Sequence, residues 1–199
     1  MRRWNGWGDP ERAKPLPRAV QALLPLLRGR VRKPTPPAEL PAVRLVPSRL
    51  NDADLEALAG AVGAEYIDAS AESRIAHAGG RSTPDLLRRR QQTQDAPDAV
   101  VRPGSHDEVR ACLDLATARG IAVIPFGGGT SVVGALDPER GTHRAVISLD
   151  LRRLSGLIRL DPVSGEATLA AGTTGPDAEA LLAEHGFELG HYPQSFRYA

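Results

Sequence analysis

The sequence has little of several features that mark common classes of protein. Its single cysteine, Cys112, excludes an intrachain disulfide and favours a reducing compartment, so we expect a cytoplasmic protein. The 25 lysine and arginine residues nearly balance the 24 aspartate and glutamate residues, and the net charge of +1 provides no overall field for nucleic acid or an anionic membrane. Nucleic acid is therefore not an expected partner.

Long hydrophobic runs are also absent. The apolar stretch from Ala19 to Leu27 is short, is interrupted by Pro25, and is followed by basic residues where a signal peptide would have small ones. We expect neither a signal peptide nor a transmembrane segment. With 41% hydrophobic residues, the 199-residue chain can still bury a core. The basic run after the apolar stretch is interpreted as a solvated linker: Arg28, Arg30, Arg32 and Lys33.

The N-terminal region, residues 1–97, is predicted to be an arm followed by a small helical region. The first fifty residues hold nine of the 17 prolines and both tryptophans, which indicates an extended arm. Because exposed tryptophans are costly, Trp4 and Trp7 should dock onto a folded body. A helix is expected from the N-cap Asn51 to Gly63.

Two polar stretches complete this region. Residues 77–85 are rich in turn formers and carry polar groups that could face a site, but a surface loop is the favoured interpretation. The three arginines at 88–90 are interpreted as a solvated helix end.

From residue 98 onward the pattern alternates between strands and helices. Residues 99–102 and 121–124 are short apolar strands, and between them Ser105 begins a capping box whose helix ends at Gly120. This is a βαβ unit, and its crossover should be right-handed. One face of the helix carries a set of small and apolar residues, so that the cysteine is interpreted as a core residue and not as a nucleophile: Val109, Cys112, Leu113 and Ala116.

The rest of the chain continues this alternation. The expected elements are a strand at 145–150, a hairpin of 157–160 and 166–171, a helix from Thr174 to Gly186, and an extended segment at 187–189. The sequence then stops at Ala199 in the middle of a pattern. We interpret it as an N-terminal piece of a longer chain.

The stretch with the strongest functional signal is the glycine-rich loop that follows the strand at 121–124. Pro125 should end that strand, because proline has no N–H to donate to a central ladder. Gly127, Gly128 and Gly129 have no Cβ, so their amide groups can converge on an anion. The hydroxyl groups of the next two residues, Thr130 and Ser131, add donors. The pattern indicates a phosphate cradle, and a turn that binds nothing is the alternative.

The known phosphate-binding motifs do not fit this loop. The dinucleotide motif G-x-G-x-x-G would need glycine in place of Val132, and the nucleotide-hydrolase loop would need lysine in place of Ala135. Val132 and Val133 also disfavour a helix directly after the loop. The loop is therefore expected to bind phosphate through main-chain amides and hydroxyls, which argues against a nucleotide hydrolase.

Several motifs together resemble one known family. They are Arg3-Trp-Asn-Gly-Trp-Gly8, His77-Ala-Gly-Gly-Arg-Ser-Thr-Pro-Asp-Leu-Leu87, Asp98-Ala-Val-Val-Arg-Pro103, Pro125-Phe-Gly-Gly-Gly-Thr-Ser131 with Val-Val-Gly134, Ser148-Leu-Asp-Leu151 and Gly190-His-Tyr-Pro-Gln-Ser-Phe196. By these motifs the chain is similar to the FAD-binding module of vanillyl-alcohol-oxidase-type (PCMH-type) flavoproteins, and within them to bacterial alkyldihydroxyacetonephosphate synthase-like proteins. The likeness extends through nearly the whole chain.

The resemblance implies an α+β fold of the PCMH type, with a βαβ unit and a mixed sheet preceded by the proline-rich arm and small helical region. It implies that residues 98–199 form an FAD-binding domain that is incomplete at its C-terminal end. The implied cofactor is FAD, held without a covalent bond, because Gly129 and Thr130 stand where many relatives carry the attaching histidine. The implied cofactor-binding residues are Pro125, Phe126, Gly127, Gly128, Gly129, Thr130, Ser131, Gly134, Gln194, Ser195, Phe196, Tyr198 and Ala199.

Two positions depart from the family pattern. Ala135 replaces a glycine that is common after Gly134, and Gln194 stands where eukaryotic relatives carry an acidic residue. Neither change removes main-chain donors from the glycine-rich loop.

The resemblance also implies a function for the longer protein. It would exchange the acyl group of acyl-dihydroxyacetone phosphate for a fatty alcohol, with the small-molecule substrate bound by a C-terminal domain beyond residue 199. A homodimer is the implied assembly of the longer protein. An FAD-dependent 2-hydroxy acid dehydrogenase or oxidase is the alternative enzyme, and a non-catalytic nucleotide-binding module is the alternative of another class. We assign no catalytic residue and no metal ligand in this chain, and expect the chain alone to be inactive.

Overall fold

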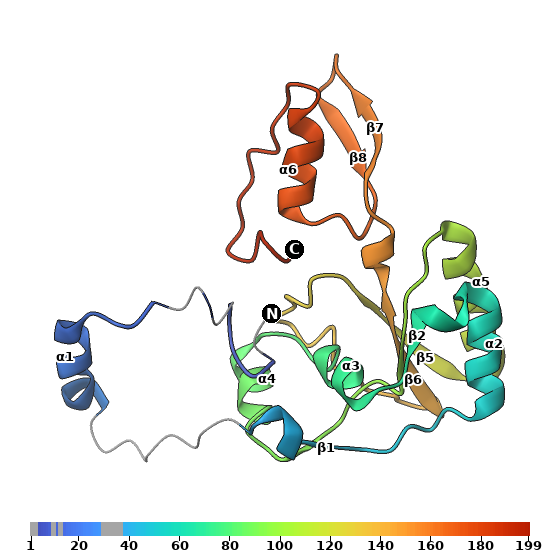
Figure 1. Cartoon of the computed structure of the whole chain (residues 1–199), viewed down its shortest axis with the longest axis horizontal. Helices are drawn as coiled ribbons and strands as arrows, with labels where there is room; N and C mark the ends of the chain where they lie inside the picture. The colour runs from blue at the N-terminus through green and yellow to red at the C-terminus, as the bar shows by residue number, and fades with distance from the viewer. Residues whose placement is uncertain (1–3, 9–10, 12–13, 29–37) are drawn as a thin grey trace.

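The computed structural model describes residues 4–8, 11, 14–28 and 38–199 (Figure 1). Most of the predicted basic linker, residues 29–37, lies outside the described residues. The N-terminal arm is not extended throughout, because residues 18–28 form helix α1 (Arg18–Arg28) with Pro25 inside it. The helix lies apart from the rest of the chain in Figure 1, and Leu23 and Leu26 on it are 52% and 78% exposed. Its alanines and leucines favour a helix, and this preference outweighs the bond that proline removes.

The helical region after the arm begins as predicted. Helix α2 (Asp52–Val62) has Asn51 as its N-cap, and a capping box joins Asn51 and Asp54. Gly63 ends the helix with a φ of 91°, which a residue with a Cβ rarely adopts. The short elements that follow or flank it are the 3-10 turns η2 (Leu40–Ala42) and η3 (Ala64–Tyr66), strands β1 (Arg44–Leu45) and β3 (Thr93–Gln94), which pair in parallel, and helices α3 (Ala71–Ala76) and α4 (Thr83–Arg88).

A four-stranded mixed sheet forms the centre of the molecule, in the order β2-β4-β6-β5. Strands β4 (Ala99–Val101), β6 (Ala145–Asp150) and β5 (Ile121–Phe126) run parallel, and β2 (Ile67–Asp68) runs antiparallel to β4. The predicted βαβ unit is present, but its two strands are not neighbours, because β6 lies between β4 and β5. The mixed sheet and the combination of helices and strands confirm the α+β class.

Helix α5 (His106–Arg119) connects β4 to β5 and packs beside α2 over one face of the sheet (Figure 1). Ser105 caps it by accepting from the Glu108 amide, and Gly120 ends it at a φ of 62°. Cys112 and Ala116 are buried as predicted, but Leu113 is 44% exposed. Consecutive helical residues are turned by about 100°, so Leu113 faces away from the sheet that covers Cys112. The main core also includes Leu58, Val62, Ala99, Val101, Ile121, Ala145, Ile147 and Leu149.

Strand β5 extends two residues beyond the predicted end. Pro125 and Phe126 pair with Leu149 and Asp150 of β6, so Pro125 does not stop the strand. Within the described part of the chain β5 is an edge strand that pairs only with β6. A proline is tolerated there because the ladder needs donors on one side only.

The C-terminal part forms a smaller lobe beyond the 3-10 turn η4 (Leu151–Arg153). Strands β7 (Leu157–Asp161) and β8 (Glu166–Leu169) make the predicted antiparallel hairpin, and helix α6 (Gly175–Ala183) lies beside it (Figure 1). Residues 187–189 form no strand, although an extended segment was predicted. The chain then runs back, and its C-terminus lies between this lobe and the central sheet (Figure 1).

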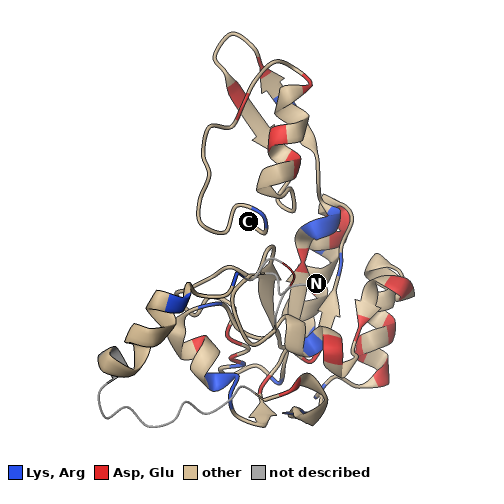
Figure 2. Ribbon diagram, turned by 60° about the vertical axis from the view of Figure 1, so that its left-hand side comes forward, with Lys and Arg blue, Asp and Glu red and all other residues tan. Residues whose placement is uncertain are grey.

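Charges of both signs are interspersed along the described chain, as Figure 2 shows, in keeping with the near-neutral net charge. None of the described helices is long and apolar enough to cross a membrane.

The buried cysteine leads to a first prediction. Burial raises the pKa of the Cys112 thiol to about 11, and Glu108 adds to the shift, so the thiolate that reacts with labelling reagents is scarce. We expect native protein at pH 8 to react with a thiol reagent on the order of 100-fold more slowly than protein in 6 M guanidinium, because reaction requires local opening. Equal rates would show that α5 does not hold Cys112 against the sheet.

Candidate functional site

The glycine-rich loop begins at the carboxyl end of β5, on the edge of the parallel strands where α/β sheets bind ligands. Residues 127–144 contain neither helix nor strand, so no helix N-terminus follows the loop, as predicted. The groups that the loop offers to an anion are therefore the main-chain amides and hydroxyls of its own residues.

The local geometry of the loop requires glycine at two positions. Gly129 has a φ of 63°, which disfavours any residue with a Cβ. A Cβ on Gly128 would overlap the carbonyl oxygen of Tyr198. Gly127 has no atom within 4 Å of the place where its Cβ would be. The loop is thus packed against the chain at Gly128 and open at Gly127.

Hydrogen-bond donors in the loop fit a phosphate ligand. No described residue accepts a hydrogen bond from the amide of Thr130 or Ser131, whereas the Ser131 carbonyl accepts from the amide of Arg81 at 2.6 Å. Of the glycines before these donors, Gly127 has open space at its Cβ position, whereas Gly128 is packed against Tyr198. The donor set and the absent side chains fit a diphosphate, which needs several N–H groups around one oxygen cluster.

The C-terminal turn, which holds the predicted cofactor-binding residues from Ser195 to Ala199, lies against this loop. The turn at the C-terminus has Tyr198 and Ala199 donating to the Ser195 carbonyl, at 2.7 and 3.0 Å. Ala199 accepts from the Gly175 amide at 2.7 Å, and a Cβ on Gly175 would overlap the ring of Phe196. The structure therefore brings Gly128, Tyr198, Ala199 and the start of α6 together.

Other predicted site residues lie farther from this meeting point. Phe126 is buried, and its ring centroid lies 4.3 Å from that of His77. Pro125 is exposed on the edge strand, and Gln194 is exposed ahead of the C-terminal turn. Gly134 has a φ of 77° and accepts from the Asp137 amide, so it forms the turn that closes the loop.

Sequence reasoning missed the turn at residues 172–175 as part of this site. A Cβ on Gly172 would overlap the carbonyl oxygen of Leu151, just as a Cβ on Gly175 would overlap the ring of Phe196. The sequence Gly172-Thr-Thr-Gly175 repeats the glycine and hydroxyl composition of the loop at 127–131. This composition was available as a signal, but it was interpreted only as the start of a helix.

Residues 77–85 are not the predicted surface loop, because several of them are buried against the glycine-rich loop and hydrogen-bonded to its main chain. Gly79 donates to the Leu136 carbonyl at 2.9 Å, and a Cβ on Gly80 would overlap the Ser131 carbonyl. His77, Arg81 and Asp85 are all at most 5% exposed. The turn formers that suggested a surface loop instead allow this close packing of two main-chain segments.

His77 joins this support to the central sheet. Its Nε2 lies 3.2 Å from Oδ2 of Asp150, the last residue of β6, and its Nδ1 lies 2.7 Å from the Ser73 carbonyl. Burial alone would raise the pKa of Asp150, but hydrogen bonds from Arg152 and His77 outweigh it and hold the pKa well below its usual range. Asp150 therefore stays ionised and fixes His77 under Phe126.

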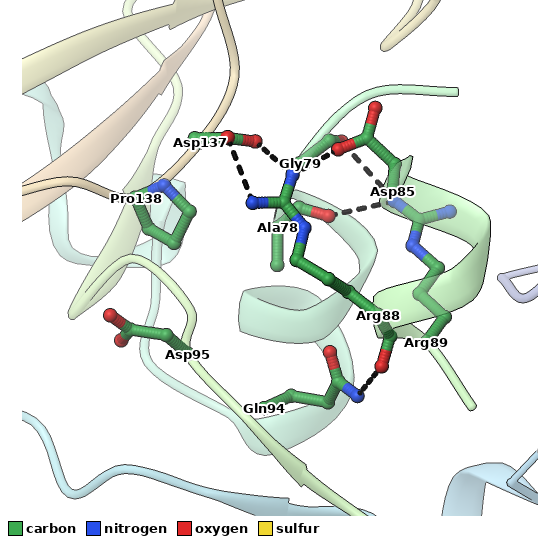
Figure 3. Close-up of a pocket in the computed structure, with 9 residues that line it drawn as sticks. All are labelled: Ala78, Gly79, Asp85, Arg88, Arg89, Gln94, Asp95, Asp137 and Pro138. Atoms are coloured by element: carbon green, nitrogen blue, oxygen red, sulfur yellow. Dashed lines mark hydrogen bonds and ion pairs between the residues drawn. The ribbon is translucent and has the colours of Figure 1, made fainter. Parts of the chain in front are cut away.

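A small charged pocket adjoins the far end of the loop (Figure 3). Arg88 contacts Asp85 and places its guanidinium 2.8 Å from Oδ1 of Asp137, so it joins helix α4 to the loop. Arg89 is 5% exposed and donates to the carbonyls of Ala78 and Gly79, at 2.7 and 3.2 Å. The prediction of a solvated helix end is therefore wrong for Arg89, although Arg90 is exposed.

Comparisons with known proteins agree with this site. A family model described as an FAD binding domain matches residues 97–199. Alkyldihydroxyacetonephosphate synthase of Trypanosoma brucei brucei is 34% identical over 220 residues, which cover 99% of this chain and 36% of that protein. A solved structure of alkyldihydroxyacetonephosphate synthase has a TM-score of 0.84 and 30% identity, covering 100% of this chain and 41% of the other. A structure of p-cresol methylhydroxylase shares the fold, with a TM-score of 0.55 and 15% identity over 71% of this chain and 27% of the other.

The family match covers the strands, the glycine-rich loop and the C-terminal turn that form the site. This chain spans 36% of the length of the Trypanosoma brucei brucei and Dictyostelium discoideum alkyldihydroxyacetonephosphate synthases, which match 99% of it. FAD is the cofactor, in agreement with the donors and close packing at residues 127–131. The chain therefore belongs to the FAD-binding domain family, among the PCMH-type flavoproteins that include alkyldihydroxyacetonephosphate synthase.

Proposed function

We propose that this chain holds the FAD of an alkyldihydroxyacetonephosphate synthase-like enzyme. The close approach of Gly128 to Tyr198 is the observation that carries the proposal, because it joins two cofactor-lining segments that are distant in sequence. The amides of Thr130 and Ser131, with their hydroxyls, would bind the diphosphate. The turn at 172–175 and residues 194–199 would form the opposite wall.

In this proposal the two regions of the chain have different roles. Residues 98–199 form the cofactor domain, and residues 1–97 support it through β2, α2 and the segment around His77. FAD supplies the redox-active ring on which the family's chemistry takes place. The residues described here bind and orient the cofactor, and we place the substrate-binding groups in the part of the relatives that this chain does not span.

Binding of the dinucleotide tests the proposal directly. We expect titration with the purified chain to quench the fluorescence of FAD or to shift its absorbance. ADP should compete with FAD, because it shares the diphosphate. FMN, which has no diphosphate, should not compete. Acid precipitation should release all the flavin into the supernatant, because Gly129 and Thr130 stand where an attaching histidine would be needed for a covalent bond. Flavin that stays with the precipitate, or equal competition by FMN, would contradict the site assignment.

The reaction of the whole protein separates the two enzymatic alternatives. A synthase should convert acyl-dihydroxyacetone phosphate and a labelled fatty alcohol into labelled alkyl-dihydroxyacetone phosphate and a free fatty acid, with no net reduction of flavin. A 2-hydroxy acid dehydrogenase should instead bleach the flavin absorbance when its substrate is added without oxygen. The similarity of 34% over nearly the whole chain to a protein named as the synthase favours the first outcome.

Location and assembly are further parts of the proposal. The single buried cysteine supports a reducing compartment, and we propose the cytoplasm. The exposed Val20, Leu23 and Leu26 of α1 support association with a second copy, and we propose a homodimer. Sedimentation equilibrium over a range of concentrations would detect it.

A further inference from the structure

The N-terminal arm contacts the segment that supports the glycine-rich loop, and this contact has no part in the FAD-binding role described above. Arg81 donates to the Trp4 carbonyl from Nη1 at 2.9 Å, and Arg89 donates to the same oxygen. Both arginines are 5% exposed. One main-chain carbonyl of the arm is therefore shared by two buried guanidinium groups from opposite ends of helix α4.

The same two arginines position the residues that touch the loop. Arg89 also donates to the Ala78 and Gly79 carbonyls, and Arg81 donates its own amide to the Ser131 carbonyl at 2.6 Å. A guanidinium has a planar fork of donors that can hold several carbonyls in fixed directions, which lysine cannot do. The orientation of residues 78–81 thus depends on the Trp4 carbonyl of the arm, which holds both guanidinium groups in place.

The supporting residues in turn leave the loop little freedom. Gly79 donates to the Leu136 carbonyl at 2.9 Å, and Gly80 packs so closely on Ser131 that no Cβ fits between them. Because Ser131 offers one of the amides without a partner in the described chain, its orientation bears directly on the anion. A continuous path of contacts runs from Trp4 through Arg81 and Arg89 to the phosphate donors.

We propose that the docked arm, residues 4–8, positions the glycine-rich loop, and that Arg81 and Arg89 are the positioning residues that transmit its effect. Arm docking and FAD binding are then coupled: each is stronger when the other is present, by the same factor. The positioning of the loop can be tested without FAD, and only the coupling to FAD binding rests on the proposed function.

Hydrogen exchange of the chain without FAD is the first test. We expect deletion of residues 1–8, or Arg89→Lys, to speed amide exchange in peptides covering 127–137 about tenfold, a typical size for such coupling. Peptides from β6 should be unchanged, because they lie in the core. Arg90→Lys is the matched control, since Arg90 is the exposed neighbour of Arg89, and it should match wild type.

FAD provides the reciprocal readout. Both altered proteins should bind FAD about tenfold more weakly than wild type, with unchanged far-ultraviolet circular dichroism. FAD should also shift the fluorescence of Trp4 and Trp7, the only tryptophans in the chain, and this shift should disappear in Arg89→Lys. With FAD at a saturating concentration, loss of the shift in Arg89→Lys would report lost coupling and not weaker binding.

These experiments distinguish failure of the positioning role from failure of the proposed FAD binding. If the 1–8 deletion leaves exchange at 127–137 unchanged, the proposal is overturned, whatever the fate of Arg89→Lys. If exchange increases as expected but wild type binds no FAD, the positioning role stands and the proposed function fails. If FAD binds equally to wild type and the deletion, the coupling is absent and the proposal is overturned.

Discussion

Replacing Gly128 by valine should weaken FAD binding by at least about 100-fold while the central sheet stays folded. The Cβ of any residue at 128 would overlap the Tyr198 carbonyl oxygen. The Cβ is held in place by its bond to Cα and the oxygen belongs to the main chain, so the overlap is relieved only if one of the two segments moves. A β-branched residue adds two further carbons at the same place. The glycine-rich loop and the C-terminal turn would separate, and the two walls of the site would no longer meet.

This expectation differs from the one that the sequence alone suggests. From the sequence, a side chain at 128 should occupy the space of the diphosphate itself. The structure shows instead that Gly128 faces the chain and that Gly127 has open space beside it. Gly127→Ala therefore locates the ligand: lost FAD binding with unchanged melting would place the diphosphate on the Gly127 side.

Fluorescence titration with FAD and thermal melting without it measure the two effects separately. Gly60→Val is the matched control, because Gly60 lies exposed on α2 with no atom within 4 Å of its Cβ position. It should bind FAD as wild type does. If Gly128→Val retained full affinity, the contact between the loop and the C-terminal turn would have no role in holding the cofactor.

Local signals in the sequence are enough to predict most of the helices and strands, because each of these elements is specified by residues that are close together in the chain. The cap at Asn51, the glycine at 120 and the mostly apolar run at 145–150 each specify a structure within a few residues of chain. The glycine-rich loop was identified for the same reason: three residues without side chains cannot be explained by a strand or a helix.

Long-range contacts account for what the sequence did not predict. The place of β6 between β4 and β5 depends on pairing with strands that are 24 and 48 residues away in the sequence, for which no local pattern exists. The burial of residues 77–81 depends on the loop around Ser131, and the burial of Arg89 depends on Trp4. Polar and glycine-rich segments are interpreted as surface when their partner is distant, and here the partner is the binding loop itself.

Asp54 combines both kinds of contact, and replacing it by asparagine should lower the free energy of unfolding by about 2 kcal/mol at pH 7. The carboxylate closes the capping box of α2 by accepting from the Asn51 amide at 3.0 Å. It also accepts from Arg144, at 2.6 and 2.8 Å, and from Arg119 at 2.9 Å. It thereby ties α2 to the end of α5 and to the start of β6.

The size of this effect follows from the exposure of the partners. Asp54 is fully buried, but the side chains of Arg144 and Arg119 are 41% and 37% exposed. After substitution the arginines can turn to water, so the loss should be smaller than for a buried pair left with one charge. Asp114→Asn is the matched control, because its carboxylate is 76% exposed and 3.8 Å from Arg110, and it should cost less than about 0.5 kcal/mol.

The acid dependence gives the sharper result. The hydrogen bonds from Arg144, followed by those from Asn51 and Arg119, outweigh the effect of burial and hold the pKa of Asp54 far below its usual value of 3.8. A carboxyl group whose folded pKa is depressed stabilises the protein above its unfolded pKa, and that stability is lost as the pH falls below about 4. Urea unfolding at pH 7, 4 and 3 should show a loss in wild type that is smaller in Asp54→Asn, because asparagine does not titrate. Parallel loss in both proteins would assign acid sensitivity to other carboxylates, of which Asp150 is the first candidate because its pKa is lowered in the same direction.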